Sequence, residues 1–445
     1  MPNNAISEIQ ARYILDRVPD AALYPPGTAP GSVSAEFIYR AGCVLTYRRD
    51  QDRVLAALAR LGPEHSTDGT VLLRGEPDGE PIPGLSRIRL VFAPVKNPDP
   101  VQRARVMFST LEAVERDLGA GTVGPDHLVS VAGPSPGGVV GWCPATEPDL
   151  PPPDATPAPG ISQSRCDGHG TRVAVVDGGL VEQAALKHPW MNGVTGQPDE
   201  LALPGSPVEP YGGHGTFCAS IVRAMAPQAE VMVARGLAVA GAAYESDVVQ
   251  ELLAALDWAP DVISLSAGTH TWNNAGMLSF KVFVDGPLRS REGTVLVAAA
   301  GNDGLDWKFS PAEMEPVIGV GALGPPGDAL AWFSNYGDWV KVYAPGQDLV
   351  HAFGYGTYTY QEQNIGATAA FDGMARWSGT SFSTPLVAGL IAARMSGTGD
   401  SAREAAHALL RLAREQALPG VGPVLHPGQA CLRLCEEQHR HHDPR

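Results

Sequence analysis

The sequence lacks long apolar runs and a recognisable export signal. No stretch approaches the roughly 20 apolar residues that a transmembrane helix needs, which disfavours a membrane-anchored protein. The first residues, MPNNAISEIQARYILD, contain no basic region followed by an apolar stretch, so we expect no secretory signal. These absences predict a cytoplasmic protein that does not associate with membranes.

Cysteine is also scarce. The 445 residues include 6 cysteines, which are Cys43, Cys143, Cys166, Cys218, Cys431 and Cys435. This number is too small for the dense disulfide framework of a small secreted domain, so we expect reduced thiols. The last two cysteines are four residues apart, but no neighbouring histidine or cysteine cluster completes a zinc site, and we expect no metal in the chemistry.

Positive charge is in deficit, since 32 Lys+Arg face 48 Asp+Glu and give a formal net charge of −16. Residues 1–145 hold 14 basic and 16 acidic side chains, a net of −2, so the remainder carries −14. An acidic chain of this kind argues against nucleic-acid binding. It mildly favours basic or neutral peptides as partners, although solubility alone would explain the same charge.

Proline is abundant and marks a division of the chain. The segment PATEPDLPPPDATPAPG, residues 144–160, holds seven prolines in 17 residues and is expected to be an extended linker. It separates an N-terminal domain, 1–143, from a larger domain, 161–435, which a polar tail, 436–445, follows. In the first domain, strands are predicted at 36–47, 86–94 and 127–133, and helices at 49–62 and 99–119. This order is typical of a small ferredoxin-like α+β sandwich.

Three segments of the larger domain carry candidate catalytic residues. VAVVDGG (173–179) ends an apolar strand in Asp177, GGHGTFCAS (212–220) starts a helix at His214, and WSGTSFSTPLVAG (377–389) places Ser381 at a helix start. Pro385 is expected in the first turn of that last helix, where its missing N–H costs little. A fourth segment, VLVAAAGND (295–303), supplies Asn302.

These residue types suit nucleophilic catalysis. A serine hydroxyl attacks a carbonyl only when a base takes its proton, and a neutral imidazole does this near neutral pH. A buried carboxylate fixes the imidazole tautomer and stabilises the imidazolium that forms. Hydrogen-bond donors must then hold the new oxyanion, which is the role of an asparagine amide and a backbone N–H.

The four segments resemble those of the subtilisin-like serine peptidases, the subtilase family. Its Asp-x-Gly, His-Gly-Thr and Gly-Thr-Ser-x-x-x-Pro motifs occur here in that order, and the resemblance covers roughly residues 165–430. It implies a three-layer α/β fold with a mostly parallel sheet. It also implies a serine endopeptidase in which Asp177 orients His214, His214 is the base, Ser381 attacks and Asn302 helps to hold the oxyanion.

The resemblance further implies how a substrate binds. One pocket wall consists of Ser266, Ala267 and Gly268, which pair with the substrate backbone, and the opposite wall consists of Ala299, Ala300 and Gly301. Small side chains on both walls leave room for a substrate side chain, although ordinary close packing would also select them. No cofactor is required for the chemistry. Structural calcium is common in the family, but the spacing of Asp303 and Asp306 defines no calcium site.

Several neighbouring residues test this assignment. His169-Gly170-Thr171 repeats the histidine motif, but β-branched residues follow it, so we interpret it as a surface turn. Ser383 lies on another helix face than Ser381 and is expected to be structural. Cys218 lies one helical turn after His214, so a mercurial would block the site through it, unless Cys218 is simply a small buried apolar residue. The related sedolisins use a glutamate base and an oxyanion aspartate, whereas this chain has His214 and Asn302.

The role of the N-terminal domain stays open. Subtilase propeptides are small α+β sandwiches that precede the catalytic domain, so residues 30–140 are interpreted as an inhibitory domain with self-cleavage in the linker. The alternative is a permanent recognition or regulatory domain. For the whole chain, an intracellular processing or regulated protease is favoured over a pseudoprotease scaffold that binds a peptide without cutting it.

Overall fold

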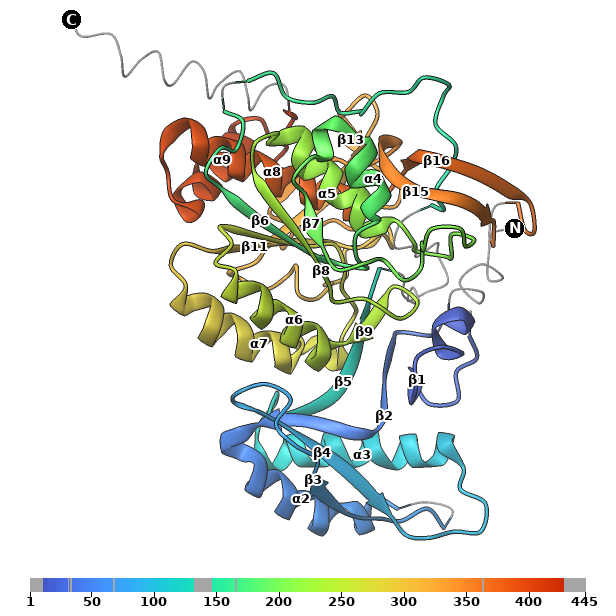
Figure 1. Cartoon of the computed structure of the whole chain (residues 1–445). Helices are drawn as coiled ribbons and strands as arrows, with labels where there is room; N and C mark the ends of the chain where they lie inside the picture. Colours follow the sequence, from blue (N-terminus) through green and yellow to red (C-terminus); the bar gives the residue numbers. More distant parts are fainter. Residues whose placement is uncertain are drawn as a thin grey trace, which may run out of the picture.

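The computed structural model describes residues 11–427 except 31, 33, 67–68, 132–145, 165 and 362–363. The larger domain is built around a sheet with the strand order β13-β12-β11-β10-β6-β8-β7, and β14 lies beside β12 (Figure 1). Every neighbouring pair runs parallel except β12 with β13. The strands are β6 Arg172–Asp177, β7 Thr195–Gly196, β8 Glu230–Arg235, β10 Val262–Leu265, β11 Val295–Ala299, β12 Ile318–Gly324, β13 Ala329–Leu330 and β14 Val342–Pro345.

Helices cover both faces of this sheet, which confirms the predicted three-layer α/β fold (Figure 1). One face carries α5 His214–Met225, α8 Thr380–Thr398 and α9 Ala402–Glu415, and the other carries α6 Glu245–Asp257 and α7 Leu278–Phe283. Because both faces are buried, the central strands are mostly apolar, and in β11 every residue is apolar and buried. Shorter helical segments are α4 Glu182–Lys187, the 3-10 turns Arg48–Asp50, Pro189–Met191 and Trp272–Asn274, and the π-turn Val284–Leu288.

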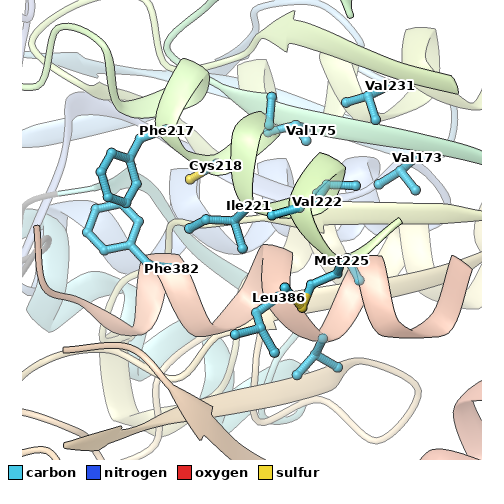
Figure 2. Close-up of a cluster of buried hydrophobic side chains, with 14 of the residues drawn as sticks. Val173, Val175, Phe217, Cys218, Ile221, Val222, Met225, Val231, Phe382 and Leu386 are labelled. Atoms are coloured by element: carbon cyan, nitrogen blue, oxygen red, sulfur yellow. The ribbon is translucent and has the colours of Figure 1, made fainter. Parts of the chain in front are cut away.

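The helices α5 and α8 are locked together. Figure 2 shows Phe217 and Ile221 of α5 facing Phe382 and Leu386 of α8 inside the same apolar cluster. The helices approach so closely that a methyl group added to Gly389 would lie 2.7 Å from Met225 Cβ. This contact fixes the relative position of the two helices whose first turns hold His214 and Ser381.

The N-terminal domain has the predicted ferredoxin-like topology. Its sheet has the order β3-β4-β2-β5 and α2 and α3 pack on it, while β1 pairs with β2. The elements are β1 Ala21–Tyr24, β2 Phe37–Tyr47, α2 Gln51–Glu64, β3 Leu72–Pro77, β4 Leu85–Phe92, α3 Pro100–Leu118 and β5 Val123–Ser130. The sequence did not indicate β3, because most of its side chains are exposed or half-exposed and no apolar alternation marks it.

The two domains share hydrogen bonds rather than merely a linker. Strand β5 pairs antiparallel with β9 Ala242–Tyr244 of the larger domain, and the N-terminal sheet lies against α6 and α7 (Figure 1). The described part of the proline-rich segment, residues 146–160, is bound to the hairpin β15 Leu349–Thr359 and β16 Thr368–Trp377. Asp149 exchanges backbone hydrogen bonds with Arg376, and Ala158 does so with Val350.

Some predictions fall outside the described residues, namely those on Cys143, Cys431, Cys435 and the tail 436–445. The other three cysteines, Cys43, Cys166 and Cys218, are free and buried. None of the described helices combines the length and the apolar character that crossing a bilayer demands.

Candidate active site

The three predicted catalytic residues come together at one edge of the parallel sheet. Asp177 is the last residue of β6, His214 is the first residue of α5, and Ser381 is the second residue of α8. All three are buried, with at most 1% of their surface exposed. This edge, outside the carboxyl ends of the strands, is where open α/β sheets place their sites.

Asp177 holds the imidazole in one orientation. Its Oδ1 accepts from the Gly178 N–H at 2.7 Å and lies 2.7 Å from His214 Nδ1. Nδ1 therefore carries the proton that is donated to the carboxylate, and Nε2 is the basic nitrogen. Among the described residues, His214 Nε2 has no hydrogen-bond partner, so its lone pair can accept a proton.

The start of α5 is shaped by a glycine and by a carboxylate that no motif marks. A methyl group added to Gly215 would lie 2.5 Å from Gly179 O, so only glycine lets this helix approach the Asp177 turn. Asp199 Oδ2 accepts from the Gly213 N–H at 2.7 Å, just before His214. Burial raises the pKa of Asp199 to about 6, against the lowering effect of the backbone hydrogen bonds it accepts. We regard Asp199 as a positioning residue.

Ser381 is held by its neighbour Ser266 in two ways. The Ser381 hydroxyl donates to the Ser266 carbonyl at 3.4 Å, and the Ser266 hydroxyl donates to the Ser381 carbonyl at 2.7 Å. Pro385 explains the second bond. It is the sixth residue of α8, beyond the first turn where we expected it, and its missing N–H deprives the Ser381 carbonyl of its helical donor. The Ser266 hydroxyl supplies the replacement.

Cys218 lies between the base and the nucleophile. Its Sγ is 3.9 Å from His214 Nδ1, 3.5 Å from Ser381 O and 3.6 Å from Ser266 Oγ. The side chain is fully buried, and burial, followed by the charge of Asp177, raises the pKa of the thiol well above its usual value. The buried thiol therefore stays protonated, and a protonated thiol is unreactive. Inhibition by a mercurial through Cys218 stays a prediction.

Asp177, His214 and Cys218 are also the described residues whose grouping would suit a metal ion, with their ligand atoms within 4.8 Å of one another. Two observations oppose this use. His214 Nδ1 is already bonded to Asp177, and the raised thiol pKa disfavours the thiolate that a metal binds. The arrangement fits acid–base chemistry better than metal ligation.

Asn302 lies beside the nucleophile with its amide oriented. Its Oδ1 accepts from the Thr380 N–H at 2.8 Å and from the Thr380 hydroxyl at 2.9 Å. The opposite end of the carboxamide, the Nδ2 donor, therefore points away from Thr380. A donor here, together with the N–H of Ser381 at the positive end of α8, suits an oxyanion.

The predicted pocket walls follow two neighbouring parallel strands, β10 and β11. The first wall already pairs with a peptide segment, which belongs to the N-terminal domain. Ser130 N–H donates to Gly268 O at 3.2 Å, and Gly268 N–H donates to Ser130 O at 3.3 Å. Across this segment, the Val131 N–H donates to Gly241 O at 2.9 Å. The chain's own residues thus lie where the resemblance places the substrate backbone.

Two residues that could be mistaken for the catalytic histidine and serine have structural roles instead. His169 is exposed in the turn before β6, as predicted. Ser383 is buried and its hydroxyl donates to Ala344 O at 3.0 Å, which accounts for a serine at that position.

A serine beside an imidazole that meets a buried carboxylate, at the edge of a parallel sheet, defines the class of α/β serine hydrolases. Residues 168–421 match the Subtilase family, and because this is more than half of the chain, the chain belongs to that family. The match favours the subtilase interpretation over the sedolisin alternative.

Curated relatives agree with this family. A thermophilic serine proteinase of Bacillus sp. (strain AK1) is 34% identical over 238 residues, which cover 50% of this chain and 51% of that protein. Thermitase of Thermoactinomyces vulgaris is 32% identical over 247 residues, which cover 53% of this chain and 78% of thermitase. The chain thus spans about half the length of the first relative. The solved structure of fervidolysin from Fervidobacterium pennivorans, a keratinolytic enzyme related to subtilisin, matches with a TM-score of 0.54. The match covers 89% of this chain and 61% of fervidolysin, and at 19% sequence identity it shows a similar fold.

Proposed function

We propose that the protein is a serine endopeptidase that cuts peptide bonds through an acyl-enzyme. The observation that carries this proposal is the 2.7 Å contact between His214 Nδ1 and Asp177 Oδ1, which leaves Nε2 to act as base beside Ser381. The Ser381 hydroxyl must turn from the Ser266 carbonyl towards Nε2 for proton transfer, and such tightening on substrate binding is common.

The steps follow from this geometry. Ser381 Oγ gives its proton to His214 Nε2 and attacks the substrate carbonyl carbon, whose oxygen becomes an oxyanion held by Asn302 Nδ2 and the Ser381 N–H. The imidazolium returns the proton to the amine that leaves as the C–N bond breaks, and an ester to Ser381 remains. Water then gives a proton to His214, attacks the ester, and releases the acid and the free serine.

We further propose that the N-terminal domain restrains this activity by occupying the substrate groove. Supporting this, β5 lies antiparallel to β9 and its end, Ser130 and Val131, is bonded to Gly268 on one side and Gly241 on the other. A peptide held between two backbone edges in this way excludes a competing substrate, because main-chain hydrogen bonds give such augmentation its affinity.

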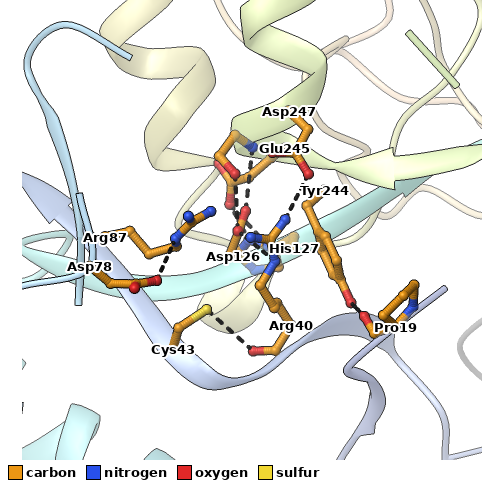
Figure 3. Close-up of polar contacts among 11 residues, drawn as sticks. Pro19, Arg40, Cys43, Asp78, Arg87, Asp126, His127, Tyr244, Glu245 and Asp247 are labelled. Carbon is orange, nitrogen blue, oxygen red and sulfur yellow. Dashed lines mark hydrogen bonds and ion pairs between the residues drawn. The ribbon is translucent and has the colours of Figure 1, made fainter. Parts of the chain in front are cut away.

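Charged and polar side chains strengthen the same interface (Figure 3). Asp126 of β5 accepts from the Ser246 N–H at 3.3 Å and from its hydroxyl at 3.0 Å, so it caps the N-terminus of α6 from the other domain. Glu245, which belongs to the larger domain, in turn accepts a hydrogen bond from the His127 N–H of the N-terminal domain at 3.2 Å. Arg40 lies 3.3 Å from Asp126, which keeps this buried carboxylate paired.

We propose a regulated role inside the cell, in a compartment that keeps thiols reduced. The three buried free cysteines support this location, because none of them has formed a disulfide. Thiol alkylation of the intact producing cells, followed by lysis and fractionation, tests it.

A cleavage assay with two matched serine variants tests the peptidase proposal. We expect the wild-type chain to digest an unfolded protein and a peptide library, and Ser381→Ala to lower turnover by roughly 10⁶-fold, the loss known for the serine of subtilisin. Ser383→Ala removes a hydroxyl two residues away that bonds only Ala344 among the described residues, so its activity should stay within a few-fold of the wild type. A folded wild type that binds peptides without cutting them would instead establish the scaffold function.

A further inference from the structure

An aromatic ring fills the space between the two pocket walls, which the sequence led us to expect to be open. A methyl group added to Gly268 would lie 2.3 Å from Phe309 Cε1, and one added to Gly301 would lie 3.0 Å from Phe309 Cγ. Gly268 follows β10 and Gly301 follows the neighbouring strand β11. One ring therefore lies against both walls, in room that the two glycines leave free.

The backbone on both sides of Phe309 is tied down. Thr269 N–H donates to Ser310 O at 3.0 Å, and Ser310 N–H donates to Thr269 O at 2.9 Å. On the other side, His270 Nδ1 lies 3.1 Å from Lys308 O. Phe309 is only 6% exposed, so turning the ring out of this position would transfer a large apolar surface into water.

His270 supports the ring from behind. Its ring centroid lies 5.3 Å from that of Phe309, and its Nε2 lies 3.1 Å from Asp303 Oδ2. Both imidazole nitrogens face acceptors, so both carry a proton and His270 is a cation. Burial, the largest single influence, lowers the pKa of His270, but the charge and hydrogen bond of Asp303, the Lys308 carbonyl and the charge of Glu313 together raise it above its usual value. A paired, buried cation at this position opposes any displacement of Phe309.

We propose that Phe309 makes the pocket shallow and restricts the P1 residue, which precedes the cut bond, to small side chains such as glycine, alanine or serine. The inference rests on the proposed peptidase function. A close-packed wall accepts added volume only if it moves, so a larger P1 side chain loses transition-state binding. One excess methylene costs roughly tenfold or more in specificity, and leucine or phenylalanine adds several.

Tetrapeptide anilides that differ only at P1 test the proposal with the protein expressed from the whole chain and allowed to process itself. We expect wild-type kcat/KM for alanine to exceed that for leucine and phenylalanine by at least about tenfold. In Phe309→Gly the gap should close or reverse, and Phe309→Ala should fall between, which also covers a failure of the glycine variant to fold. Trp332→Gly is the control, because Trp332 is an aromatic residue that is 55% exposed and whose ring packs on Phe333, so its loss should leave the P1 order unchanged.

The ratio of kcat/KM between two P1 residues does not depend on the fraction of active enzyme. That fraction is measured separately with a fluorophosphonate, which reacts only with an activated serine. A wild type that reacts with the fluorophosphonate and cuts after phenylalanine as fast as after alanine overturns this inference alone. The inference is also overturned if Trp332→Gly changes the P1 order as much as Phe309→Gly does. A folded, processed wild type that neither reacts nor cuts any peptide overturns the peptidase function, and this inference with it.

Discussion

The amide nitrogen of Val131 donates to the carbonyl oxygen of Gly241 across 2.9 Å, so the end of the N-terminal domain is bonded to the larger domain. On its other side the same segment pairs with Gly268, two residues from Ser266, whose carbonyl lies 3.4 Å from the Ser381 hydroxyl. The described end of the N-terminal domain therefore lies close to the segment that holds Ser381, which leads to a prediction about self-cleavage.

The first prediction concerns the bond that the protein cuts in itself. Ser130 lies opposite Gly268 in an antiparallel pair. Continuing this register by two positions would put position 132 opposite Ser266, beside the nucleophile, so we expect cleavage between Ala132 and Gly133. This lies ahead of the proline-rich linker, where composition alone led us to expect the cut. Intact mass and N-terminal sequencing of purified wild type should give a chain that begins at Gly133.

The Ser381→Ala chain should stay at the full 46.7 kDa in the same preparation. A new terminus within 144–160, or the same terminus in Ser381→Ala, would contradict the register argument.

The second prediction concerns the cap that Asp126 places on α6. Replacing Asp126 with alanine removes the acceptor of the Ser246 N–H and hydroxyl, and loss of such a cap costs about 1 kcal/mol. In an uncut Ser381→Ala background, amide hydrogen exchange over residues 242–246 should therefore be roughly fivefold faster.

Arg60→Ala is the matched control for this exchange measurement. Arg60 pairs with Asp117 on the exposed surface of the same N-terminal domain, so its loss should leave exchange over 242–246 unchanged. Unaltered exchange in Asp126→Ala would show that the cap does not hold the domains together.

The third prediction concerns acid stability and His351. This side chain is fully buried on β15 against Phe217, and neither of its ring nitrogens has a hydrogen-bond partner among the described residues. Burial lowers the pKa of His351 to about 3. The unfolded chain binds a proton near pH 6.5 that the folded chain excludes, so stability is retained above pH 6.5 and lost as pH falls towards 3.

Between pH 7 and pH 5 this group alone should cost about 2 kcal/mol of unfolding free energy. His351→Leu should remove that part of the pH dependence in urea unfolding of the Ser381→Ala chain. His169→Leu, at an exposed turn, should not. Equal pH dependence in wild type and His351→Leu would show that His351 is not the acid-sensitive group.

The sequence predicted most of what the chemistry needs, because short-range patterns carry it. Asp177 ends an apolar strand, and His214 and Ser381 start helices, so their local segments already aim them at one sheet edge. The helices and strands of the N-terminal domain were likewise predicted, apart from β1 and β3.

The parts that the sequence did not reveal depend on contacts between distant segments. Asp126 caps a helix that begins about 120 residues later, and no local pattern announces that pairing. Phe309 follows Asn302 by seven positions. Only the fold brings the Phe309 ring between Gly268 and Gly301, where the sequence had led us to expect an open pocket. Asp199 shapes the turn before His214 from a loop without regular spacing.

The central claim is that His214 activates Ser381 as a nucleophile, and covalent labelling tests it most directly. A fluorophosphonate should modify the processed wild-type protein at one residue, and peptide mapping by mass spectrometry should place the adduct on Ser381. His214→Ala should carry no adduct under the same conditions. A folded, processed wild type without an adduct on Ser381, or an equal adduct in His214→Ala, would contradict the claim.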